Sequence, residues 1–319
     1  MFACTFALVP ASIIFIHYHK TGHDAVGLIS REVAKVLRVK PSVVGQRRRC
    51  DSTMRPLSCN SSIVIWTAPT LACLPPGVLP SCFDVLHFVR DPATWAISAY
   101  DYHRQVPTPE RGLVDRVRPM CLEPPAYYHL GHDHSSRAVH ACRNLFDANH
   151  SLYNHLLTLP EYDGVKMMAL RNILSESGGT EDAGGDLMRM VTNALMLRQD
   201  PARHIHNVWM DELKARPEAV LSGVLDFAGA RSSSLLDALL SQQMKLMSTS
   251  RHVTNRPANM ANATRRVPEL IRELEADRDI APIHTIARSV FTWGWNHQTH
   301  VLRSDLGVGG TGQNRTEQT

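Results

Sequence analysis

The sequence predicts an α/β fold: a three-layer sandwich dominated by helix, with a central, mostly parallel sheet and a P-loop-like, anion-binding turn. Two strand-turn-helix segments, at 13–37 and 83–103, are the main observations behind this prediction. The third is a series of later segments whose apolar residues recur at helical spacing. At 319 residues, with 44% hydrophobic and 20% charged residues, the chain can bury the core of one large domain.

The first segment is a β-branched apolar run from Ile13 that breaks into Lys20-Thr21-Gly22. An amphipathic helix follows at once and should end near Lys40-Pro41. A buried strand that feeds a helix N-terminus leaves backbone N–H groups unpaired, at a place where the helix dipole favours negative charge. Lys20 adds a full positive charge, so phosphate is the expected ligand. The turn lacks the preceding glycine of the ATPase pattern G-x-x-x-x-G-K-[ST].

The second segment, at 83–103, contains another short apolar strand, Val85 to Val89. Arg90 lies at its carboxyl end, and Pro92 opens a helix that carries Ser98. In open α/β sheets, ligands bind outside the carboxyl ends of the strands, where both Lys20 and Arg90 fall. The planar fork of arginine pairs bidentately with phosphate, and a hydroxyl can complete the shell. Arg90 and Ser98 are therefore expected to converge on one anion.

These motifs resemble those of the sulfotransferases that use 3′-phosphoadenosine 5′-phosphosulfate (PAPS). The stretch HYHKTGHD is similar to the family's turn for the 5′-phosphosulfate, and RDPATWAISAY is similar to its 3′-phosphate motif. A third stretch, VWMDELKARPEAVLSGVLDFAGA at 208–230, resembles the family's late strand, acidic turn and Arg-Pro-Glu helix. The resemblance covers 13–104 and 205–230 well, while 105–200 and the tail match only loosely. Three motifs in the right order are more specific than any one of them.

The resemblance implies a domain at 1–304 that transfers a sulfuryl group from PAPS, without a metal, to a hydroxyl or amine acceptor such as a carbohydrate or small alcohol. A late basic stretch at 250–256 looks like the family's loop over the 3′-phosphate, although a solvated loop is equally consistent with it. By this resemblance, the residues that bind the co-substrate are Lys20, Thr21, Gly22, His23, Arg90, Ser98, Arg251 and Arg256.

The catalytic assignments are Lys20, His23 and Asp24, and two departures from the family pattern bear on them. The family has small hydroxyl residues where this chain has His23 and Asp24, and Asp24 is either an N-terminal cap of the helix or a base. The cytosolic aryl branch carries a catalytic His on the strand that corresponds to 63–67, which has none here. The chain is therefore closer to the Golgi, carbohydrate-type branch. The candidate bases are His19, His23, Asp24 and His103.

Two other functions remain open from the sequence. A catalytically inactive protein that binds PAPS or another nucleotide fits the unassigned base and the His23-Asp24 departure. A P-loop kinase fits less well, because it needs a longer glycine loop and an Asp that holds Mg²⁺ at the end of a second strand. Here that strand ends in Arg90.

The compartment is also open. Seven cysteines contain no C-x-x-C pair, and their odd number leaves at least one thiol free. Sequons at Asn60, Asn149, Asn262 and Asn314 favour the secretory lumen and a glycoprotein, and there Cys50 to Cys82 could also pair. The run from Phe2 to Ile16 lacks a basic region and is needed as the first strand, so the expectation is no signal peptide and no membrane segment. The protein is then either cytoplasmic or the truncated catalytic domain of a Golgi enzyme.

The net charge of +4 does not indicate a nucleic-acid partner, and the cluster at 47–49 fits a solvated loop better than a site for an acidic glycan. The expected loops are 105–119, a polar acceptor-binding loop within 121–142, and an acidic loop at 175–186. His129, His132 and His134 suggest a metal, but no further ligand spacing completes a known site. The tail at 305–319 should be disordered. Helices are expected at 144–159, 186–199, 217–228, 234–248 and 267–277.

Overall fold

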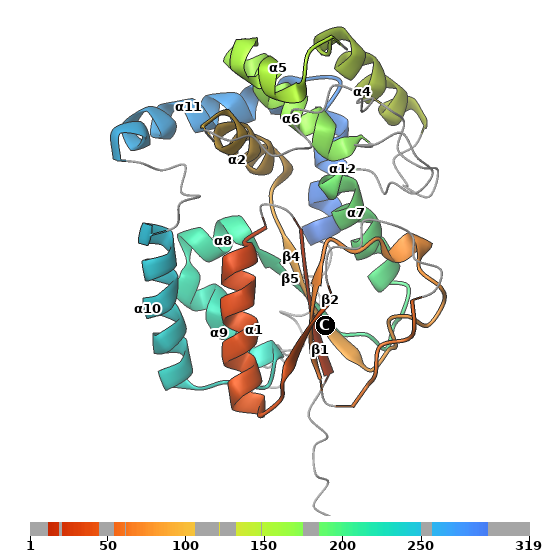
Figure 1. Cartoon of the computed structure of the whole chain (residues 1–319), viewed down its shortest axis with the longest axis vertical. Coiled ribbons are helices and arrows are strands. Elements are labelled where there is room, and N and C mark those ends of the chain that lie inside the picture. The colour runs from red at the N-terminus through yellow and green to blue at the C-terminus, as the bar shows by residue number, and fades with distance from the viewer. Residues whose placement is uncertain are drawn as a thin grey trace, which may run out of the picture.

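A computed structural model gives the fold of the chain (Figure 1). It describes residues 12–18, 21–44, 54–60, 62–105, 121, 132–147, 149–174, 185–249 and 257–292. Outside these residues lie most of the predicted loops at 105–119 and 175–186, the cluster at 47–49, the basic residues Arg251 and Arg256, Lys20 and the tail. At the edges of the two loops, Gln105 belongs to a helix that starts at Pro92, and Asp186 begins another helix.

One five-stranded sheet, in the order β2-β3-β1-β4-β5, forms the centre of the described chain. All four strand pairings are parallel, which confirms the predicted α/β class and parallel sheet. The strands are β1 (Ser12–His17), β2 (Pro41–Val44), β3 (Ile63–Thr67), β4 (Phe83–Val89) and β5 (Ile205–Trp209).

Helices cover both faces of this sheet and so complete three layers (Figure 1). One layer contains α1 (His23–Leu37), α8 (Met210–Ala215), α9 (Pro217–Phe227) and α10 (Ser233–Thr249). The opposite face is covered by the short helix η1 (Leu71–Cys73), α7 (Asp186–Leu197) and α12 (Ala281–Thr292). Beyond the carboxyl ends of the strands lie α2 (Pro92–Gln105), α4 (His132–Leu145), α5 (Leu152–Thr158), α6 (Glu161–Ile173) and α11 (Pro257–Ala276).

Alternate residues of each central strand enter two different cores. Ile13 and Phe15 of β1 pack with α1 and α9, whereas Ile14 and Ile16 pack with α7 on the other face. Every residue of β1 is therefore buried, as a parallel sheet with two covered faces requires. This double burial explains why the strands appear in the sequence as continuous apolar runs.

Three of the predicted helices are confirmed: 186–199, 217–228 and 234–248 correspond to α7, α9 and α10. The prediction of one helix over 144–159 is wrong, because α4 ends at Leu145 and α5 begins at Leu152. Ser151 separates them as a cap whose side chain accepts a hydrogen bond from the Asn154 N–H. The helix predicted at 267–277 starts earlier, at Pro257.

Within the expected acceptor loop, the segment from His132 onward is not a loop, because it forms α4. This helix is mostly polar, and among its described side chains, those of 133–145, the deeply buried ones are Ala138, Val139, Ala141 and Cys142. Its apolar stripe is too narrow to stand out in the sequence.

Disulfides join Cys59 to Cys82 and Cys121 to Cys142. The pairing of Cys50 with Cys82, which the sequence left open for the secretory lumen, is therefore wrong, since Cys82 pairs with Cys59. Cys73 is also disulfide-bonded. In the part of the chain that is described, no helix is long and apolar enough to cross a membrane.

Three buried histidines, His17, His87 and His284, are at most 1% exposed and make the fold sensitive to weak acid. Burial is the main cause that lowers the pKa of each from 6.5 to about 4. Above pH 6.5 these rings are neutral in both the folded and the unfolded chain. As the pH falls from 6.5 to 4, only the unfolded chain takes up the protons, so stability is lost in that window.

We expect the free energy of unfolding, measured with urea, to fall between pH 7.5 and pH 5 by on the order of 2 kcal/mol per buried histidine. His284→Leu should reduce this fall by about one histidine's share, because neither ring nitrogen of His284 has a hydrogen-bond partner among the described residues. The matched control is His204→Leu, since the His204 side chain is 75% exposed. An unchanged pH dependence in His284→Leu would contradict this explanation.

Candidate functional site

The carboxyl edge of the sheet is the expected place for a ligand, and its centre lies between β1 and β4. These neighbouring strands are connected in opposite directions: β1 leads through α1 to β2 at one edge, and β4 leads on toward β5 at the other. Such a reversal opens a crevice at the strand ends, where open α/β sheets bind their ligands.

The turn after β1 is held by hydrogen bonds of Thr21. Its N–H and its hydroxyl both donate to the Tyr18 carbonyl, at 3.2 and 2.9 Å, and its Oγ1 accepts from the Tyr18 N–H at 2.6 Å. The Thr21 side chain is fully buried. Thr21, predicted as a co-substrate contact, therefore fixes the turn through its hydroxyl.

Gly22 ends this turn in a left-handed conformation, with φ 79°, and is the N-cap position of α1. A Cβ added at Gly22 would lie 2.3 Å from Cε of Met210, at the start of α8. The left-handed conformation favours glycine here, whereas the close contact involves only the flexible end of the Met210 side chain. Met210 thus places the start of α8 beside the turn after β1.

The first turn of α1 has no side-chain cap. Of the two alternatives for Asp24, cap or base, the cap is therefore wrong, because Gly22 holds the cap position and Asp24 is an exposed residue of the first turn. N–H groups at this end of the helix therefore lack a side-chain acceptor, and an anion could supply one. Asp24 remains one of the four candidate bases, together with His23, which is also exposed. A third candidate, His19, lies outside the described residues.

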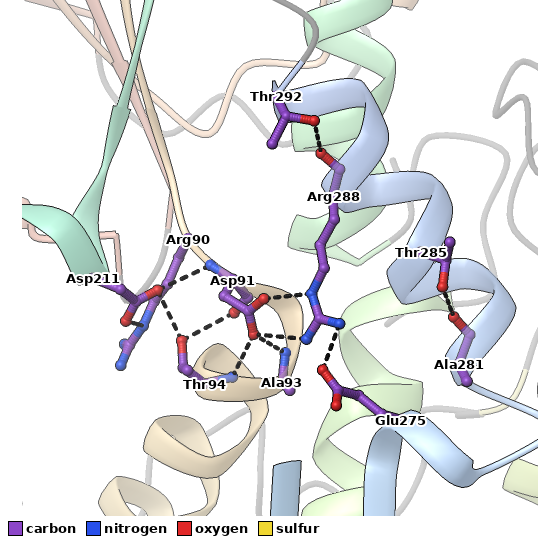
Figure 2. Close-up of polar contacts among 10 residues, drawn as sticks. All are labelled: Arg90, Asp91, Ala93, Thr94, Asp211, Glu275, Ala281, Thr285, Arg288 and Thr292. Carbon is purple, nitrogen blue, oxygen red and sulfur yellow. Dashed lines mark hydrogen bonds and ion pairs between the residues drawn. The ribbon is translucent and has the colours of Figure 1, made fainter. Parts of the chain in front are cut away.

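Arg90 follows β4 and is buried, with 6% of its surface exposed. Its Nε lies 3.5 Å from Oδ1 of Asp211, in the first turn of α8 (Figure 2). Burial lowers the pKa of Arg90, and the carboxylate of Asp211 opposes this shift. A guanidinium is thus placed at the strand ends with a carboxylate at one side of it.

Asp211 also holds the start of α2 in place. Its Oδ2 accepts hydrogen bonds from the Asp91 N–H, at 3.0 Å, and from the Thr94 hydroxyl, at 2.9 Å. Asp91 in turn accepts from the N–H groups of Ala93 and Thr94 and so caps α2, whose predicted start at Pro92 is confirmed.

The C-terminal helices are tied to the same turn. Arg288 of α12 donates from Nε to Asp91 at 2.6 Å and also pairs with Glu275 of α11 at 2.7 Å (Figure 2). The residue next to Arg90 is therefore anchored from two sides, by α8 and by α12. This bracing fixes the backbone from which the Arg90 side chain extends.

Two charged residues at this edge were not predicted to have a role, Asp211 and Lys214. The positive charge of Arg90 is the main cause that lowers the pKa of Lys214 to about 8. The sequence signal was present in the VWMDELK part of the third motif, but nothing in it placed these side chains beside Arg90.

The structure brings four of the predicted residues to one edge: Thr21, Gly22 and His23 after β1, and Arg90 after β4. Ser98 is partly exposed on α2, one turn beyond Thr94 and therefore on the same side of that helix. His103, another candidate base, is buried near the end of α2.

A histidine that was not among the candidates also reaches this edge. His17, the last residue of β1, is paired in register with Thr67 of β3, and its Nε2 lies 3.0 Å from the Thr67 hydroxyl. Its ring centroid is 5.0 Å from that of His23. The sequence places His17 on a strand, but not beside a residue of the next helix.

The described residues contain no group of three or more His, Cys, Asp or Glu side chains that could hold a metal ion. No protein-family model matches the chain, and no curated protein matches it significantly.

Proposed function

We propose that this chain is a PAPS-dependent sulfotransferase whose donor site is the carboxyl edge between β1 and β4. The acceptor is a hydroxyl or amine, for which a carbohydrate or small alcohol is the chemical class we favour. The observation that carries the proposal is that the buried Arg90 and the uncapped start of α1 after Gly22 follow two adjacent parallel strands, β4 and β1, at the same edge of the sheet. These are two independent attractions for anionic groups, on adjacent strands, and PAPS carries phosphate groups at two positions.

In this proposal the turn after β1 binds the 5′-phosphosulfate, and Arg90 binds the 3′-phosphate. Sulfuryl transfer needs an in-line acceptor, a stabilised leaving phosphate and neutralisation of the bridging oxygen. The proposal assigns the last task to Lys20. Arg251 and Arg256 are proposed to contribute further charge at the 3′-phosphate, in keeping with their place in the sequence.

A catalytically inactive protein that binds PAPS or another nucleotide is the second candidate, and of these ligands a nucleotide without the sulfuryl group fits better. The observation that favours it is the exposed carboxylate of Asp24 in the first turn of α1, since a fixed negative charge repels a neighbouring phosphosulfate. A kinase is disfavoured by the carboxylates after β4 and β5. Asp91 is engaged by Arg288 and by N–H groups, and Asp211 by Arg90 and Thr94, which leaves them poorly suited to hold Mg²⁺.

Calorimetric titration of the full chain tests the donor assignment. We expect 3′-phosphoadenosine 5′-phosphate (PAP) to bind more tightly than adenosine 5′-phosphate, because only PAP offers Arg90 a 3′-phosphate. ATP with Mg²⁺ should bind more weakly than PAP. Preference for ATP with Mg²⁺ over PAP would contradict the assignment and support a kinase.

Ser98 provides a further prediction. It lies six residues beyond Pro92, about 9 Å along the axis of α2. Ser98→Ala should weaken PAP binding by about 1 to 2 kcal/mol, the range for a hydrogen bond to a charged group, and should leave adenosine 5′-phosphate binding unchanged.

The matched control for this measurement is Ser289→Ala on α12, where the hydroxyl bonds to its own helix. Calorimetry with both ligands gives the comparison. An equal loss for PAP and adenosine 5′-phosphate would mean that Ser98 is structural and does not contact the 3′-phosphate.

A further inference from the structure

The rings of His17 and His23 are in contact at the carboxyl edge of the sheet. His17 is 1% exposed and fixed at the end of β1 by two features, its place in the sheet and its contact with the Thr67 hydroxyl. It is a rigid part of the edge rather than a mobile surface side chain.

His23 lies against this fixed ring. The two centroids are 5.0 Å apart and the ring planes are inclined by 51°, an arrangement within the usual range for contacting rings. His23 is the first residue of α1 and follows Gly22, whose backbone Met210 holds in place. Its backbone is therefore fixed by Gly22 and its ring is restrained by His17, while the side chain stays exposed at the ligand edge.

The protonation state of His17 is also compatible with a close contact between the two rings. Burial, followed by the proximity of His23, lowers the pKa of His17 to about 4, so His17 is neutral at physiological pH. Asp24 has no such contact with β1, because successive helical residues point about 100° apart. Of the candidate bases that the structure describes, His23 thus combines exposure at this edge with a ring restrained by β1, whereas His103 is buried.

We propose that His23 is the general base that accepts the proton of the acceptor group, and that His17 is the positioning residue that orients the His23 ring. This inference rests on the proposed function. The acceptor oxygen forms a bond to sulfur while the bond from sulfur to the 5′-phosphate oxygen breaks. That oxygen keeps the electron pair and leaves as PAP, and the acceptor proton moves to a ring nitrogen of His23.

The test compares kcat, KM and PAP affinity for four full-length variants. His23→Ala should lower kcat by about 100-fold or more, a much larger effect than its effect on PAP affinity. His17→Ala should lower kcat by about 10-fold, because a misplaced base is less effective. His17→Phe keeps a ring in the same place and should restore most of the activity.

The double variant His17→Ala, His23→Ala is the decisive member of the set. If His17 acts only through His23, the double variant is no slower than His23→Ala alone. The positioning role is wrong if the kcat losses of the two single variants multiply in the double variant. It is also wrong if His17→Phe is as slow as His17→Ala. His204→Ala, at the amino end of β5, is the matched control and should retain wild-type kcat. Thr67→Val offers a milder change, with a smaller loss of kcat expected, if His17→Ala does not fold.

A second measurement separates this inference from the proposed function. Nuclear Overhauser contacts between the two imidazole rings, recorded without any donor, should be present in the wild type and lost in His17→Ala. If the contact is present but PAP does not bind, the proposed function is wrong and the role of His23 fails with it. If PAP binds and turns over but the rings are not in contact, only the inference about His17 is wrong.

Discussion

Lys20→Ala is expected to lower the turnover of PAPS by about 100- to 1,000-fold, the loss typical of removing one group that stabilises charge in a transition state. Donor affinity should change far less, because the Lys20 charge matters most as the leaving oxygen becomes anionic. In the sequence, Lys20 stands between Tyr18 and Thr21, and hydrogen bonds join these two residues at the ligand edge.

The measurement is kcat in steady state, together with PAP affinity by calorimetry. Lys35→Ala is the control, since Lys35 lies near the far end of α1 and pairs with Glu32. Full turnover in Lys20→Ala would remove Lys20 from the mechanism.

Arg90→Ala has the second large expected effect, which is the loss of the preference for PAP over adenosine 5′-phosphate. In the proposed complex, Arg90 and the 3′-phosphate of PAP form a buried charge pair. Truncating one partner of such a pair costs about 2–5 kcal/mol or more, so we expect PAP affinity to fall by about 100-fold. Binding of adenosine 5′-phosphate should hardly change. Asp211 keeps its hydrogen bonds from Asp91 and Thr94 in this variant, so the start of α2 remains held.

Calorimetry with both ligands measures this preference, and Arg216→Ala is the control because Arg216 is exposed and paired with Glu212. Arg90→Lys should show an intermediate loss, since lysine keeps the charge but not the planar fork. Equal losses for the two ligands would show that Arg90 does not recognise the 3′-phosphate.

The fold prediction is confirmed where the apolar pattern of the sequence is strong. Strands β1, β3 and β4 are buried on both faces and therefore form continuous apolar runs. By contrast β2, from Pro41 to Val44, was not predicted, because this four-residue strand at the edge of the sheet has half-exposed side chains and no apolar run. The polar helix α4 was also not predicted, because its narrow apolar stripe gives a weak helical pattern in the sequence.

Only those parts of the candidate site that lie within short, continuous motifs could be predicted from the sequence. Gly22 and Arg90 belong to motifs whose chemistry is visible in a few neighbouring residues. The pairing of Arg90 with Asp211 joins residues 121 positions apart, and that of His17 with Thr67 joins strands that the chain does not visit in succession. Such contacts depend on strand order and register, which the motifs do not specify.

The most direct test of the proposed function is product formation. The full chain is incubated with sulfur-labelled PAPS and a panel of carbohydrates, phenols and small alcohols, and both PAP and labelled acceptor are measured. We predict that PAP forms together with at least one sulfated acceptor, and that Lys20→Ala abolishes both products. Tight binding of PAP with no sulfated product from any acceptor would contradict the proposed sulfotransferase activity and identify the chain as a nucleotide-binding protein.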